Sequence, residues 1–345
     1  MRRFWFGALT LSSLALAQSA TLTLPQAIHL ALAQSTQVLN AQASLQSATA
    51  QLAALKADPN TLIVPLTQAE QAVTLAQVNL QVTRLQVLQS TLSAYLALYE
   101  DLRSMALAQA QVALAQRNLA IQESKFANGN ATSLDVAQAR TALAAQQQTL
   151  ANDQAQEPSL LSQLVTDLGT NLSATPKLAP PPPPQALTAS LSELQQGLSE
   201  RLPALVQDEQ AVALDTLQVK LDDNDYTPPL TLTTAKIALG NAQRTLSLAL
   251  ANAVAQLQSA YQAAQNSFAL IAIARQNLAN AQTTLKQDQA AFKAGTVSAV
   301  QIQSDEVSLK SQKLSLQEAQ DGYWRALAAL SIAAGEDLTG LEGQP

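Results

Sequence analysis

Apolar side chains recur at helical spacing along the middle of the chain. Two stripes each repeat every seven residues and run side by side: Leu98, Met105, Val112, Leu119 and Phe126 form the first, and Leu107, Leu114 and Ile121 the second. A seven-residue period is typical of long helices that wind around one another with a left-handed twist. Two adjacent stripes predict contact with two neighbouring helices, as in a sheet or tube of helices. The alternative is a two-stranded coiled coil with one irregular seam.

The helix that carries these stripes is unusually long. From about Thr67 to Ala127 the chain has neither proline nor glycine, and about 60 residues at about 1.5 Å each give a rod of about 90 Å. A single globular core cannot enclose such a rod, so we expect it to lie against other rods.

This rod ends in a turn that predicts a hairpin. Gly129 can adopt a positive φ and cap the first helix. Thr132 or Ser133 can cap the returning helix, with Asp135 favourable in its first turn. We predict that the return helix runs from about Ser133 to Leu168 and ends at Gly169.

The same pattern occurs again 166 residues later. Phe126 corresponds to Phe292 and Gly129 to Gly295, and ungapped correspondences at this offset run from Tyr95 to Gly169. They predict a duplication. The second copy should have a long helix from about Thr233 to Lys293 and a return helix from about Ala299 to Ala334.

Proline and aspartate clusters divide the chain into regions. We expect an opening helix from Leu24 to about Lys56, a break at Ala57–Leu66, and a matching break at Asp222–Thr234. The predicted organisation is a first repeat at 21–175, a proline-rich linker at 176–188 and a second repeat at 189–340. The run Pro180–Pro184 predicts a stiff polyproline II segment. A ligand for an SH3-like domain is the alternative interpretation of that run.

The N-terminus has the pattern of a secretory signal. Arg2 and Arg3 precede an apolar run from Phe4 to Leu16, which predicts a signal peptide at 1–17, with residue 20 as the latest cleavage point. An uncleaved anchor is the alternative, but the run is shorter than the ~20 residues of a spanning helix. We expect an exported protein, and the absence of cysteine excludes a disulfide framework.

The composition gives little support to catalysis. Charged residues are 13% of the chain, aromatic residues 3%, and the net charge is −6, which argues against a nucleic-acid partner. His29 is the single histidine, so a Ser-His-Asp triad or a histidine-based zinc site would have to use it alone, and we interpret it as a partly buried or surface residue of a helix. Asp222, Asp223 and Asp225 lack the spacing of a calcium loop. We predict a non-enzyme without cofactor or metal.

With these features in place, the chain resembles the TolC-like outer-membrane efflux proteins. That family has two repeats, each opening with a Leu-x-x-Ala helix, here Leu24 to Ala27. Each repeat also has an aromatic-x-x-Gly turn followed by Asp-Val, here Phe126, Gly129, Asp135 and Val136, with Phe292, Gly295, Gln301 and Ile302 in the second copy. The resemblance implies an all-α protomer of long antiparallel hairpins, three of which form a hollow tunnel in the periplasm.

The resemblance also implies where partners meet the tunnel. The tips would contact a periplasmic adaptor and the inner-membrane pump through Phe126, Asn128, Gly129, Asn130, Phe292, Ala294, Gly295 and Thr296. The tunnel entrance would be lined by Asp135, Gln301, Ser304, Asp305 and Glu306. The acid ring of the family would fall on Gln301 and Ser304 and is not reproduced, so Asp305 and Glu306 are its candidate substitutes. Asp135 could equally serve as a charge at a helix N-terminus.

The two breaks depart from the family pattern. The family has a two-stranded β segment at each break, which three protomers close into a membrane barrel. Here only Leu62–Val64 and Leu230–Thr234 are strand-like, and a spanning strand needs about 9–11 residues. We expect at most a vestigial β segment, with short turns at the end opposite the tips.

Two functions follow. The first is an export conduit that works with an adaptor and a pump. The second is a barrel-less periplasmic coiled coil that tethers or spaces layers of the cell envelope. We expect the trimer either to sit beneath the outer membrane or to dock on a separate outer-membrane pore.

Overall fold

The computed structural model describes residues 21–169 and 176–343. Its helices are α1 (Leu24–Gln34), α2 (Thr36–Ala57), α3 (Ile63–Ala127), α4 (Ser133–Leu168), α5 (Leu191–Gln195), α6 (Leu198–Arg201), α7 (Pro203–Asp222), α8 (Pro229–Lys293) and α9 (Ala299–Ala334). The expected signal peptide at 1–17 lies outside the described residues.

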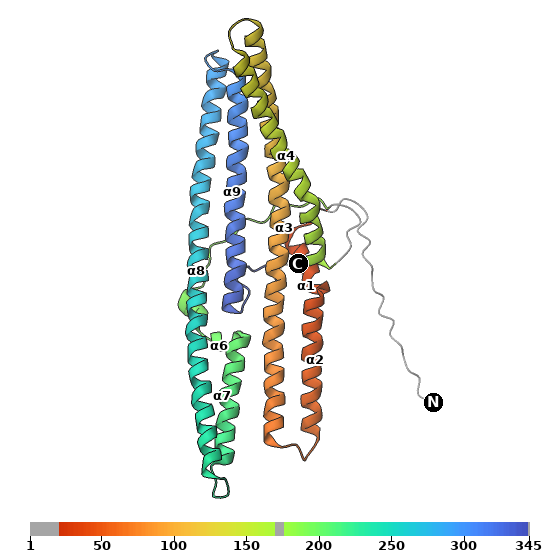
Figure 1. Cartoon of the computed structure of the whole chain (residues 1–345), viewed down its shortest axis with the longest axis vertical. Coiled ribbons are helices and arrows are strands. Elements are labelled where there is room, and N and C mark those ends of the chain that lie inside the picture. Colours follow the sequence, from red (N-terminus) through yellow and green to blue (C-terminus); the bar gives the residue numbers. More distant parts are fainter. Residues whose placement is uncertain (1–20, 170–175, 344–345) are drawn as a thin grey trace, which may run out of the picture.

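Two long helices span the molecule from end to end. Helices α3 and α8 have 65 residues each, which corresponds to about 97 Å. Helices α4 and α9 return along them from one end, and α2 and α7 pack along them at the other (Figure 1). Both tip turns therefore lie at the same end. The predicted all-α hairpin architecture is confirmed.

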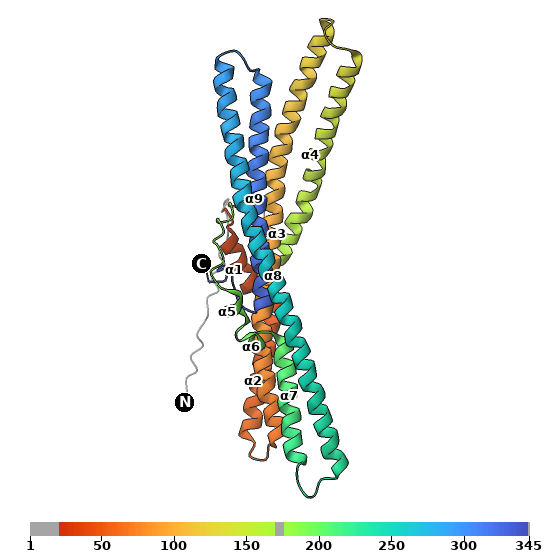
Figure 2. The same ribbon diagram turned by 90° about the vertical axis from the view of Figure 1, so that its left-hand side faces the viewer.

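The two halves of the chain have matching elements. Helix α8 begins and ends 166 residues after α3, and α9 begins and ends 166 residues after α4. The α3–α4 hairpin packs on the second half mainly through α3, which contacts α9 in the tip half and α7 in the opposite half. In Figure 2 the two hairpins diverge toward their tips.

The opening helix is broken, which the sequence interpretation did not predict. It forms α1 and α2, because Ser35 adopts φ −60° and ψ 125° and its hydroxyl accepts a hydrogen bond from the N–H of Gln37. Serine competes for backbone hydrogen bonds in this way and so favours helix starts. The second half is interrupted at the corresponding place by Gly197 and Leu202, which separate α5, α6 and α7.

The two long helices start earlier than predicted. The first was expected to start at about Thr67, after the break at Ala57–Leu66, but α3 starts at Ile63 and includes Pro65 in its first turn, where a backbone N–H has no partner in the helix. Pro229 is likewise the first residue of α8. The strand-like segments Leu62–Val64 and Leu230–Thr234 consequently fall mostly in helix. The turns between helices are residues 58–62 and 223–228, as short as expected.

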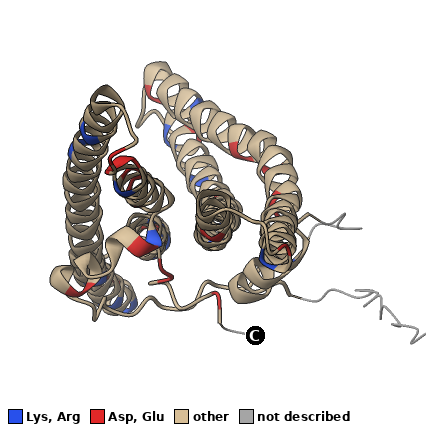
Figure 3. Ribbon diagram, turned by 90° about the horizontal axis from the view of Figure 1, so that it is seen from below, with Lys and Arg blue, Asp and Glu red and all other residues tan. Residues whose placement is uncertain are grey.

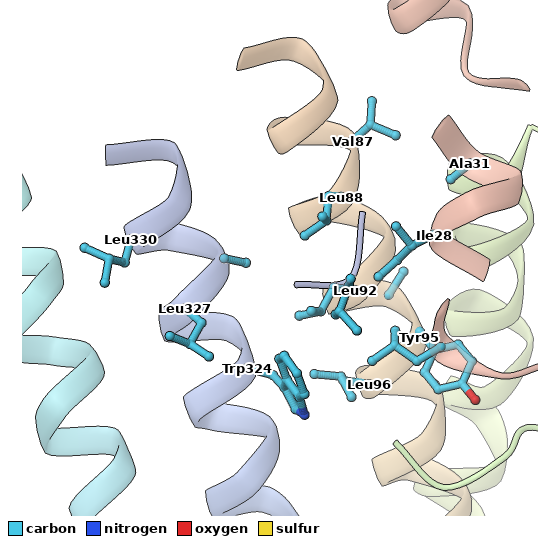
Figure 4. Packing of buried hydrophobic residues seen from close by; sticks show 14 of the residues in the cluster. Ile28, Ala31, Val87, Leu88, Leu92, Tyr95, Leu96, Trp324, Leu327 and Leu330 are labelled. Atoms are coloured by element: carbon cyan, nitrogen blue, oxygen red, sulfur yellow. The ribbon is translucent and has the colours of Figure 1, made fainter. Parts of the chain in front are cut away.

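The core is concentrated near the middle of the rod. Helix α1 packs on one side of α3 and helix α9 on the other (Figure 4). Fully buried residues there include Ile28, Leu92, Tyr95, Leu96 and Ala328. Toward the tip burial declines along the predicted stripe, from Leu98, which is fully buried, to Phe126, which is 50% exposed. The hairpins are thus anchored at their middle and less covered at their ends.

The proline-rich linker is a strap packed across this core. Leu22 and Leu178 form an isolated parallel bridge: the N–H of Leu22 donates to the carbonyl of Lys177 at 2.8 Å, and the N–H of Ala179 donates to the carbonyl of Leu22 at 2.9 Å. The indole N–H of Trp324 donates to the carbonyl of Pro182 at 3.0 Å. The Tyr95 hydroxyl lies 2.7 Å from the carbonyl oxygen of Ala179 and 2.8 Å from that of Leu22.

We expect Tyr95→Phe to lower the free energy of unfolding by about 1–3 kcal/mol, because the partly buried carbonyl of Ala179 then loses its donor, whereas that of Leu22 keeps the N–H of Ala179. Tyr261 is the matched control, since it occupies the corresponding position in the second half and its hydroxyl lies 3.4 Å from the carbonyl of Ala189. Tyr261→Phe should therefore cost less. Urea denaturation of both variants measures the difference, and equal losses would show that the strap contact is not what stabilises the core.

Candidate functional site

The first tip is built by capping interactions at both of its helix ends. Gly129 has φ +72°, and its N–H donates to the carbonyl of Phe126 at 3.0 Å. The N–H of Asn130 donates to the carbonyl of Lys125 at 2.8 Å. This pair of bonds satisfies the last carbonyls of α3 and directs the chain back.

The second tip repeats this geometry. Gly295 has φ +77°, its N–H donates to the carbonyl of Phe292 at 3.0 Å, and the N–H of Thr296 donates to that of Ala291 at 3.0 Å. The two turns therefore present the same backbone at one end of the molecule. Phe126 and Phe292 are 50% and 47% exposed, so each tip carries a half-exposed aromatic ring beside its glycine.

Asp135 forms the cap of α4. Its carboxylate accepts from the N–H and the hydroxyl of Thr132, both at 2.7 Å, and the Thr132 hydroxyl accepts from the N–H of Asp135. These hydrogen bonds, first of all the one from the Thr132 backbone, hold the pKa of Asp135 below its usual range. Asp135 thus stays ionised at the tip, where it stabilises the helix start. Ser298 caps α9, and Gln301 takes the place of the acid.

The remaining entrance candidates lie on the first two turns of α9. Gln301 and Glu306 are exposed, and Ser304 is partly exposed. Asp305 is buried between α8 and α9, and the Gln301 side-chain N–H donates to its Oδ1 at 2.9 Å. Burial raises the pKa of Asp305, and the neighbouring carboxylate of Asp288 raises it further. Among the two candidate substitutes for an acid ring, Glu306 alone is on the open surface.

The sequence analysis did not name Asp288 as a site residue, although its distance from the tip turn indicates that it lies opposite Asp305. Asp288 and Asp305 are almost equally distant in sequence from Thr296, the middle of the second tip turn, so closing the antiparallel hairpin brings them nearly level. Arg117 was missed as well; its Nη1 donates to Gln303 Oε1 at 3.4 Å and links α3 to α9 near the tips. No periodicity within one helix predicts this contact between the two halves.

A second acidic group lies where α9 meets α3, away from the tips. Asp321 is fully buried, and the Gln317 side chain donates to its Oδ1 at 2.8 Å. Burial raises the pKa of Asp321 to about 7, and the nearby Glu100 carboxylate adds to the shift. Glu100 is itself paired with Arg325 through bonds of 3.0 and 2.7 Å, and burial and Glu100 also raise the pKa of Glu318.

This group predicts a pH-dependent stability. The pKa of Asp321 is above the usual 3.8 in the folded state, so between these values the folded chain binds more protons than the unfolded chain. The contribution is fully present below pH 4 and is lost as the pH rises through about 7. Asp321→Asn keeps an acceptor for Gln317 and stays neutral, so urea midpoints of this variant should exceed those of the wild type at pH 8 and match them near pH 4.

Asp225→Asn is the control, since Asp225 lies on the exposed α7–α8 turn. An unchanged difference between wild type and Asp321→Asn across this pH range would contradict the assignment.

The positions of Lys, Arg, Asp and Glu are thinly scattered along the helices (Figure 3). Within residues 21–169 and 176–343, no three His, Cys, Asp or Glu side chains come close enough to hold a metal ion. Asp222, Asp223 and Asp225 lie on the α7–α8 turn and at its helix end, and His29 is exposed on α1. Over the same residues no helix has the length and apolar character of a membrane span.

The chain is similar to known proteins in part of its sequence and in its fold. Residues 65–170 match the family model of the outer membrane efflux proteins. A membrane protein from Pseudomonas aeruginosa has the same fold, with 15% identity, 93% of this chain and 91% of that chain covered, and a TM-score of 0.67. The CmeC outer membrane channel of Campylobacter jejuni is 12% identical to this chain. The match covers 93% of this chain and 87% of that chain, with a TM-score of 0.68. The outer membrane protein VceC of Vibrio cholerae is 16% identical to this chain. The match covers 91% of this chain and 96% of that chain, with a TM-score of 0.63.

No curated protein matches the chain. The family model covers the long first hairpin from the start of α3 to the end of α4, including the first tip. The solved structures share the fold along nearly the whole chain. The family match of residues 65–170 and the fold shared with these solved structures both agree with the resemblance to the TolC-like outer membrane efflux proteins that the sequence predicted.

Proposed function

We propose that three copies of the chain form a hollow helical tunnel in the periplasm, at the outer-membrane side of a tripartite export system. The tunnel conducts small molecules or proteins outward, together with a periplasmic adaptor and an inner-membrane pump. The observation that carries the proposal is the pair of long hairpins whose glycine tips lie at one end, on a fold shared with solved outer membrane channels.

The edges of the protomer support assembly with further copies. Helix α8 carries large apolar side chains that are more than half exposed: Ile237, Leu248, Leu270 and Ile273. A shallow groove lined mainly by small side chains, among them Ala41, Ala48, Ala72 and Ala76, lies between α2 and α3. Large side chains on one surface and a groove on another suit a head-to-tail contact, which closes into a ring when the rotation between copies permits.

The tips are the proposed contact with the adaptor. Each presents an aromatic ring, a glycine turn and small polar neighbours, namely Phe126, Asn128, Gly129 and Asn130 in the first and Phe292, Ala294, Gly295 and Thr296 in the second. Exposed aromatic rings are common anchors of protein interfaces. Asp135, Gln301, Ser304 and Glu306 would then line the entrance, while Asp305 supports the second hairpin from within.

The opposite end supports attachment toward the outer membrane. Tyr226, Leu230 and Leu62 are 97%, 77% and 73% exposed on or beside the two short turns. Exposed apolar residues gathered at one end of a protein mark a surface that meets a partner or a membrane. The protein would dock there beneath the membrane or on a separate pore. If this end serves attachment alone, the same protein would act as an envelope tether, which is the second candidate function.

We also propose that the chain is exported by a signal peptide within residues 1–20, and that residues 21–175 and 189–340 are duplicated repeats joined by 176–188. The matching bounds of α3 with α8 and of α4 with α9 support the duplication.

A deletion strain tests the conduit function. Loss of the gene should increase the accumulation of fluorescent dyes or leave secreted proteins in the cell, and the gene supplied in trans should restore export. A strain that exports normally but loses attachment between its envelope layers would favour the tether instead.

A further inference from the structure

The strap has a regular pattern of buried and exposed positions that the tunnel does not explain. Leu178, Pro181 and Pro184 are buried, whereas Lys177, Pro180 and Pro183 are exposed. Ala179 and Pro182 are partly exposed. Every third residue therefore shares one environment.

This period follows from the local sequence. Proline fixes φ near −65°, and a residue that precedes proline is restricted to extended conformations. Residues 179–183 all precede a proline, so they are held in a polyproline II helix with three residues per turn. One of its three faces is buried against the core.

Two hydrogen bonds fix the rotation of this helix about its axis. The carbonyl of Ala179 accepts from Tyr95 at 2.7 Å, and that of Pro182 accepts from Trp324 at 3.0 Å. Ala179 and Pro182 lie three residues apart and so on the same side of the strap. The outward side is thereby left to Lys177, Pro180 and Pro183 in one line.

We propose that this outward side is a docking ligand for a partner protein with an aromatic-lined, polyproline-binding groove that has a carboxylate near one end. Such grooves receive prolines at a spacing of three and leave one face of the ligand uncovered. In this chain the face that the partner does not contact would be the one packed against the core. Lys177 would pair with the carboxylate of the partner. The proposal does not depend on the tunnel function.

The packed strap has an advantage over a free proline-rich peptide. Binding a flexible ligand costs the entropy of ordering it. The strap is already ordered by its buried face and by Tyr95 and Trp324, so this cost has been met in folding. The full chain should therefore bind a suitable groove at least as tightly as a peptide of the same sequence.

The test is a calorimetric titration of the purified chain with an isolated SH3 domain that prefers Lys-x-x-Pro-x-x-Pro peptides. A peptide spanning residues 174–188 is the reference ligand. We expect the chain to bind with an affinity equal to or above that of the peptide. Pro180→Ala combined with Pro183→Ala should weaken binding at least tenfold, and Lys177→Glu at least threefold. Gln185→Ala, an exposed position outside the line, should bind as the wild type does.

Thermal melts of each variant show whether the fold is kept, and the exposed positions chosen should leave it unchanged. If the peptide binds the SH3 domain and the full chain does not, the strap is masked and the proposal is wrong. Binding by the chain that gains strength when Tyr95→Phe loosens the strap would equally overturn it. Binding that ignores both proline positions and Lys177 would show contact elsewhere.

Discussion

Replacing Gly335 by alanine is expected to lower the free energy of unfolding by about 2–4 kcal/mol, from the combined cost of a left-handed non-glycine residue and of overpacking. Gly335 ends α9 with φ +71°, and an added Cβ would lie 2.7 Å from Arg201 Cβ and 2.8 Å from its carbonyl oxygen. The second contact is with backbone, so no rotamer change can relieve it.

The surroundings of Gly335 make this collision costly. Nη2 of Arg201 donates to the carbonyls of Leu194 and Gln196 at 2.6 and 2.8 Å, and its Nη1 pairs with Glu336 at 2.5 Å. A shift of Arg201 away from Gly335 would strain these contacts, which join α5, α6 and the end of α9. The substitution therefore acts on the packing between elements as well as on one turn.

Two other glycines serve as matched controls. Gly295 has φ +77° with no atom within 4 Å of an added Cβ, so Gly295→Ala should cost about 1–2 kcal/mol. Gly169 corresponds to Gly335 in the first half, and a Cβ added there would lie 3.1 Å from the carbonyl oxygen of Gln34. The loss of unfolding free energy in Gly169→Ala should therefore lie between those of Gly295→Ala and Gly335→Ala. Urea denaturation orders the three, and equal losses in Gly335→Ala and Gly295→Ala would contradict the packing argument.

Proline at either tip is expected to abolish export. Proline cannot adopt the φ of +72° or +77° found at Gly129 and Gly295. It also removes the N–H that donates to the carbonyl of Phe126 or Phe292. The turn must reopen, which displaces the aromatic ring and the polar residues that we propose meet the adaptor. Because both tips lie far from the core, far-UV circular dichroism should change little.

Asparagine at the same positions is the control, since it tolerates the left-handed conformation better than other side-chain-bearing residues. Gly129→Asn and Gly295→Asn should retain export in the deletion strain, whereas the proline variants should not. Full export by both proline variants would show that the tip turns are not a contact site.

The sequence predicted the hairpins because their signals are local or periodic. The heptad stripe from Leu98 to Phe126, the absence of proline and glycine from Thr67 to Ala127, and the two Phe-x-x-Gly turns each constrain one helix or one turn. The offset of 166 residues then predicted the second hairpin from the first. These features predict the long helices and the tip turns without any knowledge of the contacts between the two halves.

The sequence could not predict what depends on packing between distant segments. Ser35 breaks the opening helix although nothing in its apolar period changes there. Pro65 and Pro229 lie within the first turns of α3 and α8 instead of preceding these helices, because a first turn tolerates proline. Asp305 was expected at the entrance, and its burial beside Asp288 depends on how α8 and α9 are rotated. The strap likewise needed Tyr95 and Trp324 in place before one face could be called buried.

The central claim is that copies of this chain enclose a tunnel, and electron microscopy of the purified particle tests it most directly. The account predicts end views of an open ring with threefold symmetry, and side views of a rod with paired tips at one end. A solid bundle of helices in end view, or particles that contain a single copy of the chain, would contradict it.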